Sequence, residues 1–435
     1  MPLPAAEEDA QTTSLPPAAG LGRFVRGSLG SGVSVLARAG GSVVLNKLVA
    51  VYGGPGGLTL LAHFQNLMAL LTTLPNDGVH VGIVKYLAPR RPGSAAWRAW
   101  LWAGALLNAA VLMLGFATLL LFRGRLLAVF EPTPVWVMGL MLGIALLTGH
   151  AYLAAVLLAA QRLRAYVGLT VALSVAGPLA VAAALAAGQP LPRVLLAYLM
   201  GQGLMLVPTL LTCWRLGLLR GRWQRPSRPV LLASGRFLLM ALSVLLCSKA
   251  VDFAVRNLLI SRYSLAETGL WQAAAKLSDN YTMVFSAVMG AVYYPRLAAL
   301  AHQPHAQKAF VRSVFGLLAV VLAAGLGLLW LLRDWLLPLL FDGRFAAART
   351  LLGPQLAGDW AKLLSWTLLY GLMARARVGR YVLVQVASAA VYAGLLVALL
   401  PSQGLMGAQL AHAFRFGLLL LACLFYFRPL RRPVS

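Results

Sequence analysis

Residues 215–229 read RLGLLRGRWQRPSRP and carry five arginines, in a chain that is otherwise mostly apolar. On each side of this basic segment, runs of about 20 apolar residues follow one another with short breaks, and a helix of that length spans a bilayer. Six runs precede the segment and six follow it. The basic segment therefore divides an integral membrane protein into two sets of six helices.

The composition of the 435-residue chain supports this interpretation. It is 60% hydrophobic and only 11% charged, with a mean hydropathy of +0.79, which is far more apolar than a soluble domain with a wetted surface. We predict an all-α, polytopic membrane protein of about 12 transmembrane helices. Their approximate ranges are 28–51, 57–84, 99–122, 134–160, 163–187, 192–214, 235–260, 267–295, 309–331, 351–374, 380–400 and 405–427.

The basic residues predict the orientation. The formal net charge is +26, from 37 Lys and Arg against 11 Asp and Glu. With both termini in the cytoplasm, about 23 of the basic residues fall in cytoplasmic segments and about seven on the opposite side, as the positive-inside rule requires. The charge is therefore an orientation signal that can also contact anionic membrane lipids, and no nucleic acid is needed to explain it.

The predicted organisation has five parts. They are a disordered cytoplasmic tail at 1–22, an N-terminal six-helix lobe at 23–214, a basic cytoplasmic linker at 215–234, a C-terminal six-helix lobe at 235–427 and a basic cytoplasmic tail at 428–435. Because six is even, the lobes would be parallel repeats around a central cavity. A matching spacing supports the repeat, since 28 residues separate Gly57 from Lys85 and 27 separate Gly269 from Arg296.

Charged side chains inside the predicted spans point to a site. Each costs about 2.5–3.5 kcal/mol near the bilayer centre, so something must compensate. Lys249, Asp252 and Arg256 lie within about 60° on one helical face, because a helix advances about 100° per residue. Two more helices carry charges at similar spacing and helix two carries a milder polar stripe, with the further members Lys276, Asp279, Asp359, Lys362 and Asp77.

Two interpretations fit these charges. Each acid could neutralise a base along its own helix and only lock the packing. However, three helices each place charges inward where apolar residues would pack without the desolvation cost, which favours a water-filled cavity. The candidate substrate-binding bases are Arg256, Lys362, Lys276, Lys249, Lys47 and Arg38, and the candidate coupling or ion-pairing acids are Asp279, Asp359, Asp252 and Asp77.

Other features have structural interpretations. Lys47 lies near a helix end, from which a long side chain can also snorkel to the interface. The stretch VYGGPGGL at 51–58 lacks the Lys-Ser/Thr of a phosphate loop and predicts a tight turn between helices one and two. The glycines of the first helix are expected to allow close helix contact; they are Gly30, Gly32, Gly40 and Gly41.

Motifs for enzymatic chemistry are missing. The sequence has no G-x-S-x-G, no paired-carboxylate cluster in its spans and no metal-binding cysteine pattern, and its loops are too short for a nucleotide-binding or glycosyltransferase domain. We therefore expect a transporter rather than an enzyme, with no cofactor and no metal. One of its buried acids could couple transport to a proton or sodium gradient.

Several stretches resemble the Wzx-type O-antigen translocases, in particular the branch that flips the lipid-linked repeat unit of enterobacterial common antigen. They are NKLVAVYGGPGGLTLLAHFQNL at 46–67, VKYLA at 84–88, RNLLISRYSLAETGLWQAAAKLSDNY at 256–281, WLLRDWLLPLLFDGRF at 330–345 and QLAGDWAKLLSWTLLYGLMARA at 355–376. The resemblance runs over nearly the whole chain from about Leu21.

This resemblance implies membership of the multidrug, oligosaccharidyl-lipid and polysaccharide exporter superfamily, with a MATE-like fold of two lobes that open alternately to each side. The implied substrate is an undecaprenyl-diphosphate-linked oligosaccharide for O-antigen, lipopolysaccharide or common-antigen synthesis. It would cross from the cytoplasmic to the periplasmic leaflet of the bacterial inner membrane. The implied protein partners are a polysaccharide polymerase and a chain-length regulator. Residues matching Arg256, Asp279, Asp359 and Lys362 recur in sequences of this type.

Three alternatives stay open at this point, and one of them, a purely structural partner of the polysaccharide machinery, would not need charged cavity faces. A cation-coupled multidrug antiporter of the same fold would favour an acidic or aromatic cavity, whereas the charges within the spans are basic by about seven to four. A membrane polysaccharide polymerase would be expected to carry a large periplasmic loop, whereas the largest such loop here, at about 332–350, is small.

Overall fold

The computed structural model describes residues 17–130, 132–220, 227–300, 303–374 and 378–427, and every regular element in these ranges is helical. The first half contains α1 (Pro17–Thr73), η1 (Leu74–His80), α2 (Val81–Leu87), α3 (Ala95–Leu121), α4 (Arg123–Leu126), η2 (Ala128–Phe130), α5 (Pro134–Ala159), α6 (Leu163–Ala186), α7 (Leu191–Gly203) and α8 (Leu206–Arg215). The second half contains α9 (Arg228–Val244), η3 (Leu245–Lys249), α10 (Ala250–Arg262), α11 (Leu265–Val288), η4 (Met289–Tyr293), α12 (Tyr294–Ala299), α13 (Pro304–Leu331), α14 (Arg333–Leu340), η5 (Gly343–Ala348), α15 (Arg349–Ala374) and α16 (Val378–Phe427).

Two of the helices are broken by a glycine. α1 breaks at Gly54, whose φ is +61°, and α16 breaks at Gly404, whose φ is +56°. Glycine adopts this left-handed conformation without strain because it has no Cβ. The turn predicted at 51–58 is therefore confirmed.

The described residues form twelve rods when each broken helix counts as two and consecutive pieces are joined. Rods 1 and 2 are α1 before and after Gly54, and rod 2 continues through η1 and α2. Rods 3 to 6 are α3, α5, α6, and α7 with α8. Rod 7 joins α9, η3 and α10, and rod 8 joins α11, η4 and α12. Rods 9 to 12 are α13, α15, and α16 before and after Gly404.

Hydropathy separates these rods into two kinds. Within the described residues, seven helical stretches are long and apolar enough to cross a membrane, and two of them include both parts of a broken helix. They account for all rods except 7, 8 and 10. Those three carry Lys249, Lys276 and Lys362, and ionised side chains lower the hydropathy of a span.

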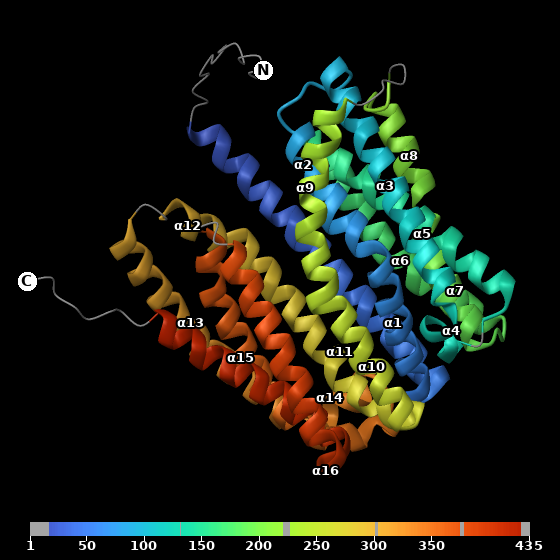
Figure 1. Ribbon diagram of the computed structural model, residues 1–435, viewed down its shortest axis with the longest axis vertical. Coiled ribbons are helices and arrows are strands. Elements are labelled where there is room, and N and C mark those ends of the chain that lie inside the picture. Colours follow the sequence, from blue (N-terminus) through green and yellow to red (C-terminus); the bar gives the residue numbers. More distant parts are fainter. Residues whose placement is uncertain (1–16, 131, 221–226, 301–302, 375–377, 428–435) are drawn as a thin grey trace, which may run out of the picture.

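The rods form two lobes, rods 1–6 and rods 7–12, that meet along what we call the seam. The seam joins residues 47–65 of the first lobe to residues 256–276 and 338–344 of the second. Figure 1 shows the lobes close together around α10, α11 and α14, and far apart at the opposite end, where α12 and α8 lie. α9 is an exception, because it packs along η1 and α3 of the first lobe.

Close backbone packing builds the centre of the seam. A Cβ added at Gly269 would lie 2.1 Å from the carbonyl oxygen of Pro55, so only glycine fits there. The hydroxyl of Thr59 donates to the carbonyl of Leu265 at 2.8 Å. The start of rod 2 therefore crosses the start of rod 8 at contact distance.

The prediction for the glycines of rod 1 is confirmed at one position and wrong at two. A Cβ at Gly41 would lie 2.4 Å from the carbonyl oxygen of Ser174, so this glycine does allow close contact with α6. A Cβ at Gly32 or Gly40 would meet nothing within 4 Å, because these glycines face away from neighbouring rods. The role of Gly30 stays a prediction.

The predicted C-terminal tail at 428–435 lies wholly outside the described residues, and the N-terminal tail and the basic linker lie partly outside them, at 1–16 and 221–226. Where the chain is described, α1 begins at Pro17, inside the predicted tail, and α9 begins at Arg228, inside the predicted linker. The five-part division stays a prediction.

Candidate functional site

A cavity of about 570 Å³ opens in the second lobe and faces the first. Rods 7, 8, 10, 11 and 12 provide its walls, and Asn66 of rod 2 closes it from the first lobe. Four bases and two acids lie in this lining; they are Lys249, Arg256, Lys362, Arg415, Asp252 and Asp279. Five of these six are candidates from the sequence, and the structure brings them together around one space.

Arg256 ties the cavity wall to the seam. Its side chain is buried, its Nε donates to Gln272 Oε1 at 2.9 Å, and its Nη1 donates to the carbonyl of Ala62 at 3.1 Å. The guanidinium also lies 5.9 Å from the ring centroid of Trp271. Arg256 thus joins rods 7 and 8 to rod 2 of the other lobe, which is the bridging geometry that a planar fork of donors allows.

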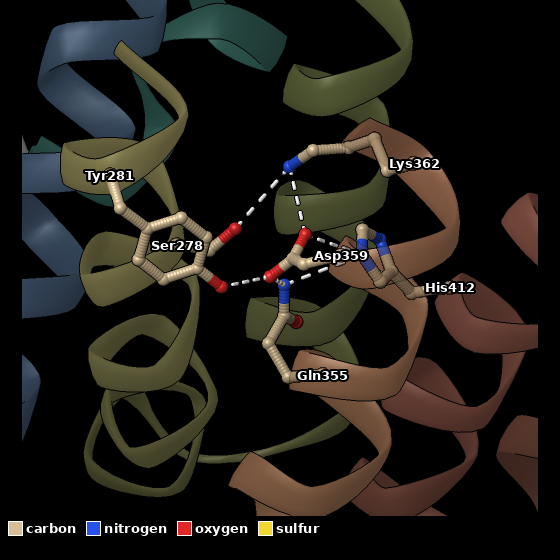
Figure 2. Close-up of polar contacts among 6 residues, drawn as sticks. All are labelled: Ser278, Tyr281, Gln355, Asp359, Lys362 and His412. Carbon is tan, nitrogen blue, oxygen red and sulfur yellow. Dashed lines mark hydrogen bonds and ion pairs between the residues drawn. The ribbon is translucent and has the colours of Figure 1, made fainter. Parts of the chain in front are cut away.

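Asp359 is the centre of a buried polar cluster (Figure 2). The carboxylate has no exposed surface and contacts four side chains. Its Oδ1 lies 2.8 Å from Lys362 Nζ and 3.1 Å from His412 Nε2. Its Oδ2 accepts from the Tyr281 hydroxyl at 2.5 Å and from Gln355 Nε2 at 2.9 Å. A buried carboxylate needs this many partners because each lone pair left empty would cost free energy.

Lys362 connects this cluster to the cavity. Besides Asp359 it donates to the hydroxyl of Ser278 at 3.3 Å, and it lies 5.6 Å from the ring centroid of Trp366. Its side chain is 10% exposed while that of Asp359 is not exposed at all. Of this ion pair, it is therefore the Lys362 ammonium that faces the cavity, while the Asp359 carboxylate lies behind it.

Three ionisable groups in the lining have no close partner. Lys249, Asp252 and Asp279 make no hydrogen bond or ion pair with any other residue that the structure describes. Asp252 and Asp279 are exposed to the cavity, and Lys249 is half-buried. Groups that are hydrated rather than paired are available to a ligand or an ion.

The structure places the other candidates elsewhere. Lys276 is buried in the seam and donates to Gln65 Oε1, and Lys47 donates to the carbonyl of Pro338 at 3.1 Å. Arg38 is exposed and contacts the carbonyl of Ser34 on its own helix at 3.4 Å. Asp77 is exposed in the wide turns of η1. None of the four lines the 570 Å³ cavity, and their proposed roles stay predictions.

On rod 12 the sequence singled out only Arg415, a base deep in its span that could line the cavity or pair with polar backbone, and sequence reasoning missed Gln409 and His412. Gln409, His412 and Arg415 all line the cavity, and their spacing of three residues puts them along one face of the helix. Arg415 donates to Ser388 Oγ at 2.8 Å and lies 5.0 Å from the ring centroid of Tyr392. This spacing was a readable signal, but no acid on rod 12 marked it as part of a charged set.

A polar contact also closes the seam at η5, the short helix that precedes α15. Arg344 donates through its Nη2 to the carbonyls of Ala50 and Val51, at 3.0 and 2.7 Å, where rod 1 ends. The same guanidinium contacts Asp342 Oδ2 at 2.6 Å, and this hydrogen bond holds the pKa of the Asp342 carboxyl below its ordinary value. With Lys47 on Pro338, these contacts form what we call the seam latch.

The residue types that bind metals are dispersed in the described part of the chain. No group of three or more His, Cys, Asp or Glu side chains there is arranged to hold a metal ion. Cys213 and Cys423 are both free and buried, in different lobes.

Comparisons with known proteins agree with this architecture. No protein-family profile matches the chain. The lipid III flippase of Escherichia coli (strain K12) is 28% identical over 403 residues, which cover 89% of this chain and 94% of that protein, and the protein of the same name from Shigella flexneri gives the same values.

Solved structures show the same fold. The lipid II flippase MurJ in an inward closed conformation superposes with a TM-score of 0.69 at 11% identity, over 92% of this chain and 87% of that one. An inward-facing MATE family multidrug resistance transporter of the MOP superfamily gives a TM-score of 0.70 at 12% identity, over 91% and 94%. The resemblance inferred from the sequence is thus confirmed: this chain is a multi-pass helical membrane protein with the fold of MATE transporters and MurJ, and it is similar in sequence to lipid III flippases.

Proposed function

We propose that this protein is a flippase for an undecaprenyl-diphosphate-linked oligosaccharide, of the lipid III or O-antigen unit class. The observation that carries the proposal is the cavity, in which four bases face two acids in a chain similar over 89% of its length to lipid III flippases. An excess of positive charge in a space between membrane-spanning rods suits an anionic head group. The activity is transport, with no covalent change to the substrate.

The physical task is to move a diphosphate and its sugars through hydrocarbon. Without a polar path their charges and hydrogen bonds would be unsatisfied, at several kcal/mol for each group. Lys249, Arg256, Lys362 and Arg415 offer charge-assisted hydrogen bonds to phosphate oxygens. The lipid tail stays in the bilayer, and the two lobes open alternately to the two leaflets.

Localisation and direction follow from the basic loops. We place the chain in the bacterial inner membrane with both termini in the cytoplasm, as the positive-inside rule predicts. The seam then lies at the periplasmic end, and the separated ends of the lobes face the cytoplasm. This arrangement fits a carrier that loads from the cytoplasmic leaflet before the seam opens.

Coupling to an ion gradient belongs to the same proposal. Asp252 and Asp279 are exposed acids in the cavity with no partner among the described residues, so either could take up a proton or a sodium ion as the lobes exchange. A polysaccharide polymerase and a chain-length regulator are the expected protein partners.

Flipping of a fluorescent lipid-linked sugar in proteoliposomes tests the proposal. We expect Arg256→Gln to reduce the initial rate by at least about 100-fold, because the variant loses a charge from the site and a bridge between the lobes. Lys362→Met should have a similar effect. Arg193→Gln is the control, since the Arg193 side chain is exposed and, among the described residues, hydrogen-bonds only to Gln189 four positions earlier.

The outcomes separate the proposed function from its alternatives. Wild-type rates in both Arg256→Gln and Lys362→Met would remove these bases from the mechanism. Transport of a cationic drug with no transport of the glycolipid would favour the multidrug antiporter of the same fold, which the two exposed acids also allow.

A further inference from the structure

Gln409 is a neutral polar side chain in the cavity lining whose amide has no partner among the described residues. Gln409 on rod 12 has no exposed surface, lines the cavity, and neither its amide nitrogen nor its amide oxygen has a hydrogen-bond partner among the described residues. A buried amide in this state costs about 1–3 kcal/mol for each unmade hydrogen bond. A side chain kept at that cost in a ligand cavity points to a partner that arrives with the ligand.

Two further lining residues share the property, and they come from both lobes. Asn66 of rod 2 has an unpartnered Nδ2, and Thr282 of rod 8 has an unpartnered hydroxyl. All three groups are neutral, whereas the contacts that hold the lobes and the Asp359 cluster together involve the charged side chains of Arg256, Asp359 and Lys362. The cavity therefore has a neutral hydrogen-bonding set besides its ionic one.

The chemistry of Gln409 restricts what this set can bind. Its side chain offers two N–H donors and one carbonyl acceptor at the same place. An ionised diphosphate supplies only acceptors, and a metal cation accepts no hydrogen bond, so neither can satisfy both ends of the amide. Sugar hydroxyl and acetamido groups donate and accept at once, which matches Gln409 fully.

The position of Gln409 agrees with this assignment. Rod 12 runs from Gly404 near the seam towards the wide end of the molecule, so Gln409 lies about 9 Å nearer the seam than Arg415. A lipid-linked substrate has a fixed order of lipid, diphosphate and sugar. Because the lipid must stay in the bilayer, the part of the substrate that reaches past Arg415 towards the seam is the sugar.

We infer that Gln409, assisted by Asn66, forms a sugar-reading subsite that recognises the hydroxyl or acetamido groups of the first sugar, separately from the bases that hold the diphosphate. This inference rests on the proposed function and deepens it. It makes the head group, rather than the lipid carrier, the basis of specificity, since a site built to hydrogen-bond a group discriminates strongly against a ligand that lacks it.

Binding of two defined lipids to the purified full-length protein in nanodiscs tests the inference. The probes are undecaprenyl diphosphate without sugar and undecaprenyl diphosphate carrying one N-acetylglucosamine. For the wild type we expect the sugar-bearing lipid to bind about 10-fold more tightly. Gln409→Leu should remove this difference and leave the affinity for the sugar-free lipid unchanged. Asn66→Leu should act in the same direction with a smaller effect.

Controls separate a direct role from a folding defect. Gln409→Glu keeps the size of the side chain and an acceptor but loses the N–H donors. It should therefore also lose the 10-fold preference for the sugar-bearing lipid. This variant keeps the test valid if Gln409→Leu folds poorly. Asn46→Leu is the matched control, because Asn46 is a buried amide with an unpartnered oxygen outside the cavity lining. It should keep the 10-fold difference.

Each contrary result has a distinct meaning. Equal wild-type affinity for the two lipids, or an equal loss for both lipids in the Gln409 variants, would overturn the sugar-reading subsite and leave the proposed function standing. Failure of the wild type to bind either lipid would overturn the proposed function itself.

Discussion

The two lobes contain similar sets of helices but differ in how they use buried polar groups. In the first lobe such groups pair as neutral partners: His80 Nε2 lies 3.2 Å from Asn108 Oδ1, and His150 Nδ1 lies 2.8 Å from Thr209 Oγ1. In the second lobe the buried groups include ions besides neutral side chains, and Asp359 lies at the centre of four contacts. The cavity lining belongs almost entirely to this second lobe.

This difference indicates a division of labour. Burying a charge in a membrane protein is expensive, so charges persist where they bind or move something. The first lobe has the polar groups expected of helix packing and contributes a wall and the seam, while under the proposed function the second lobe holds the ligand. The predictions below test the contrast, beginning with the largest expected effect.

Removing the centre of the ionic cluster should cost most. We expect Asp359→Leu to lower the free energy of unfolding by about 3–5 kcal/mol, because it leaves the Lys362 ammonium buried and unpaired. The first-lobe counterpart Asn108→Leu should cost about 1–2 kcal/mol, since only a neutral hydrogen bond to His80 is lost. Denaturant titration in detergent micelles measures both, and equal losses would contradict the contrast between the lobes.

A methyl group at the seam should cost less. Gly269→Ala places a Cβ 2.1 Å from the Pro55 oxygen and should destabilise the protein by about 1–3 kcal/mol through overpacking. Gly316→Ala on α13 is the matched control, because nothing lies within 4 Å of its Cβ position, and it should be neutral or slightly stabilising. Thermal unfolding of the two variants makes the comparison, and equal shifts would mean that the close approach carries no packing constraint.

The seam latch should have a smaller effect on the conformational equilibrium. Arg344→Ala removes hydrogen bonds to the Ala50 and Val51 carbonyls, which at an exposed position contribute about 1 kcal/mol. Distances between spin labels on either side of the seam should show about a fivefold shift towards separated lobes. Arg333→Ala is the control, because in the described part of the chain the Arg333 side chain hydrogen-bonds only to the Trp330 carbonyl and lies over the Trp330 ring. An unchanged distance distribution in Arg344→Ala would exclude a latch.

The smallest expected effect concerns pH. Hydrogen bonds from Arg344 keep the folded-state pKa of Asp342 below its ordinary value of 3.8. A lowered pKa stabilises the folded state above the ordinary value, and this contribution is lost as the pH falls through the folded value. The difference in thermal midpoint between wild type and Asp342→Asn should therefore be constant from about pH 5 to 8 and shrink below pH 3.8. A change between pH 5 and 8 would show that another group controls the latch.

Hydrophobic patterning predicted the helical architecture because a membrane span must satisfy its own backbone and face hydrocarbon over a fixed length. The break at Gly54 was also readable, since Gly-Gly-Pro-Gly cannot continue a helix unchanged. The wide turns of η1, η3 and η4 were not, because local residue types do not distinguish a π-helical turn from an α-helical one.

The candidate site could be predicted only where several charged residues recur along one face of the same helix. Lys249, Asp252 and Arg256 share one face by spacing alone, and all three line the cavity. His412 escaped notice because its acidic partner, Asp359, lies 53 residues away on another rod. Lys47 and Arg38 looked like cavity residues, but the face that a rod turns to its neighbours depends on tertiary packing, which no single sequence window contains.

The three π-helical segments have a mechanical consequence. Each interrupts one of the rods that run from the seam to the wide end of the molecule, at 74–80, 245–249 and 289–293 in rods 2, 7 and 8. A π turn breaks the regular hydrogen-bond ladder, and helices bend at such places. These three rods can therefore bend at their π-helical segments. The part of a rod beyond that segment can then tilt while the part at the seam keeps its contacts. The protein can change shape in this way without moving either lobe as a rigid body.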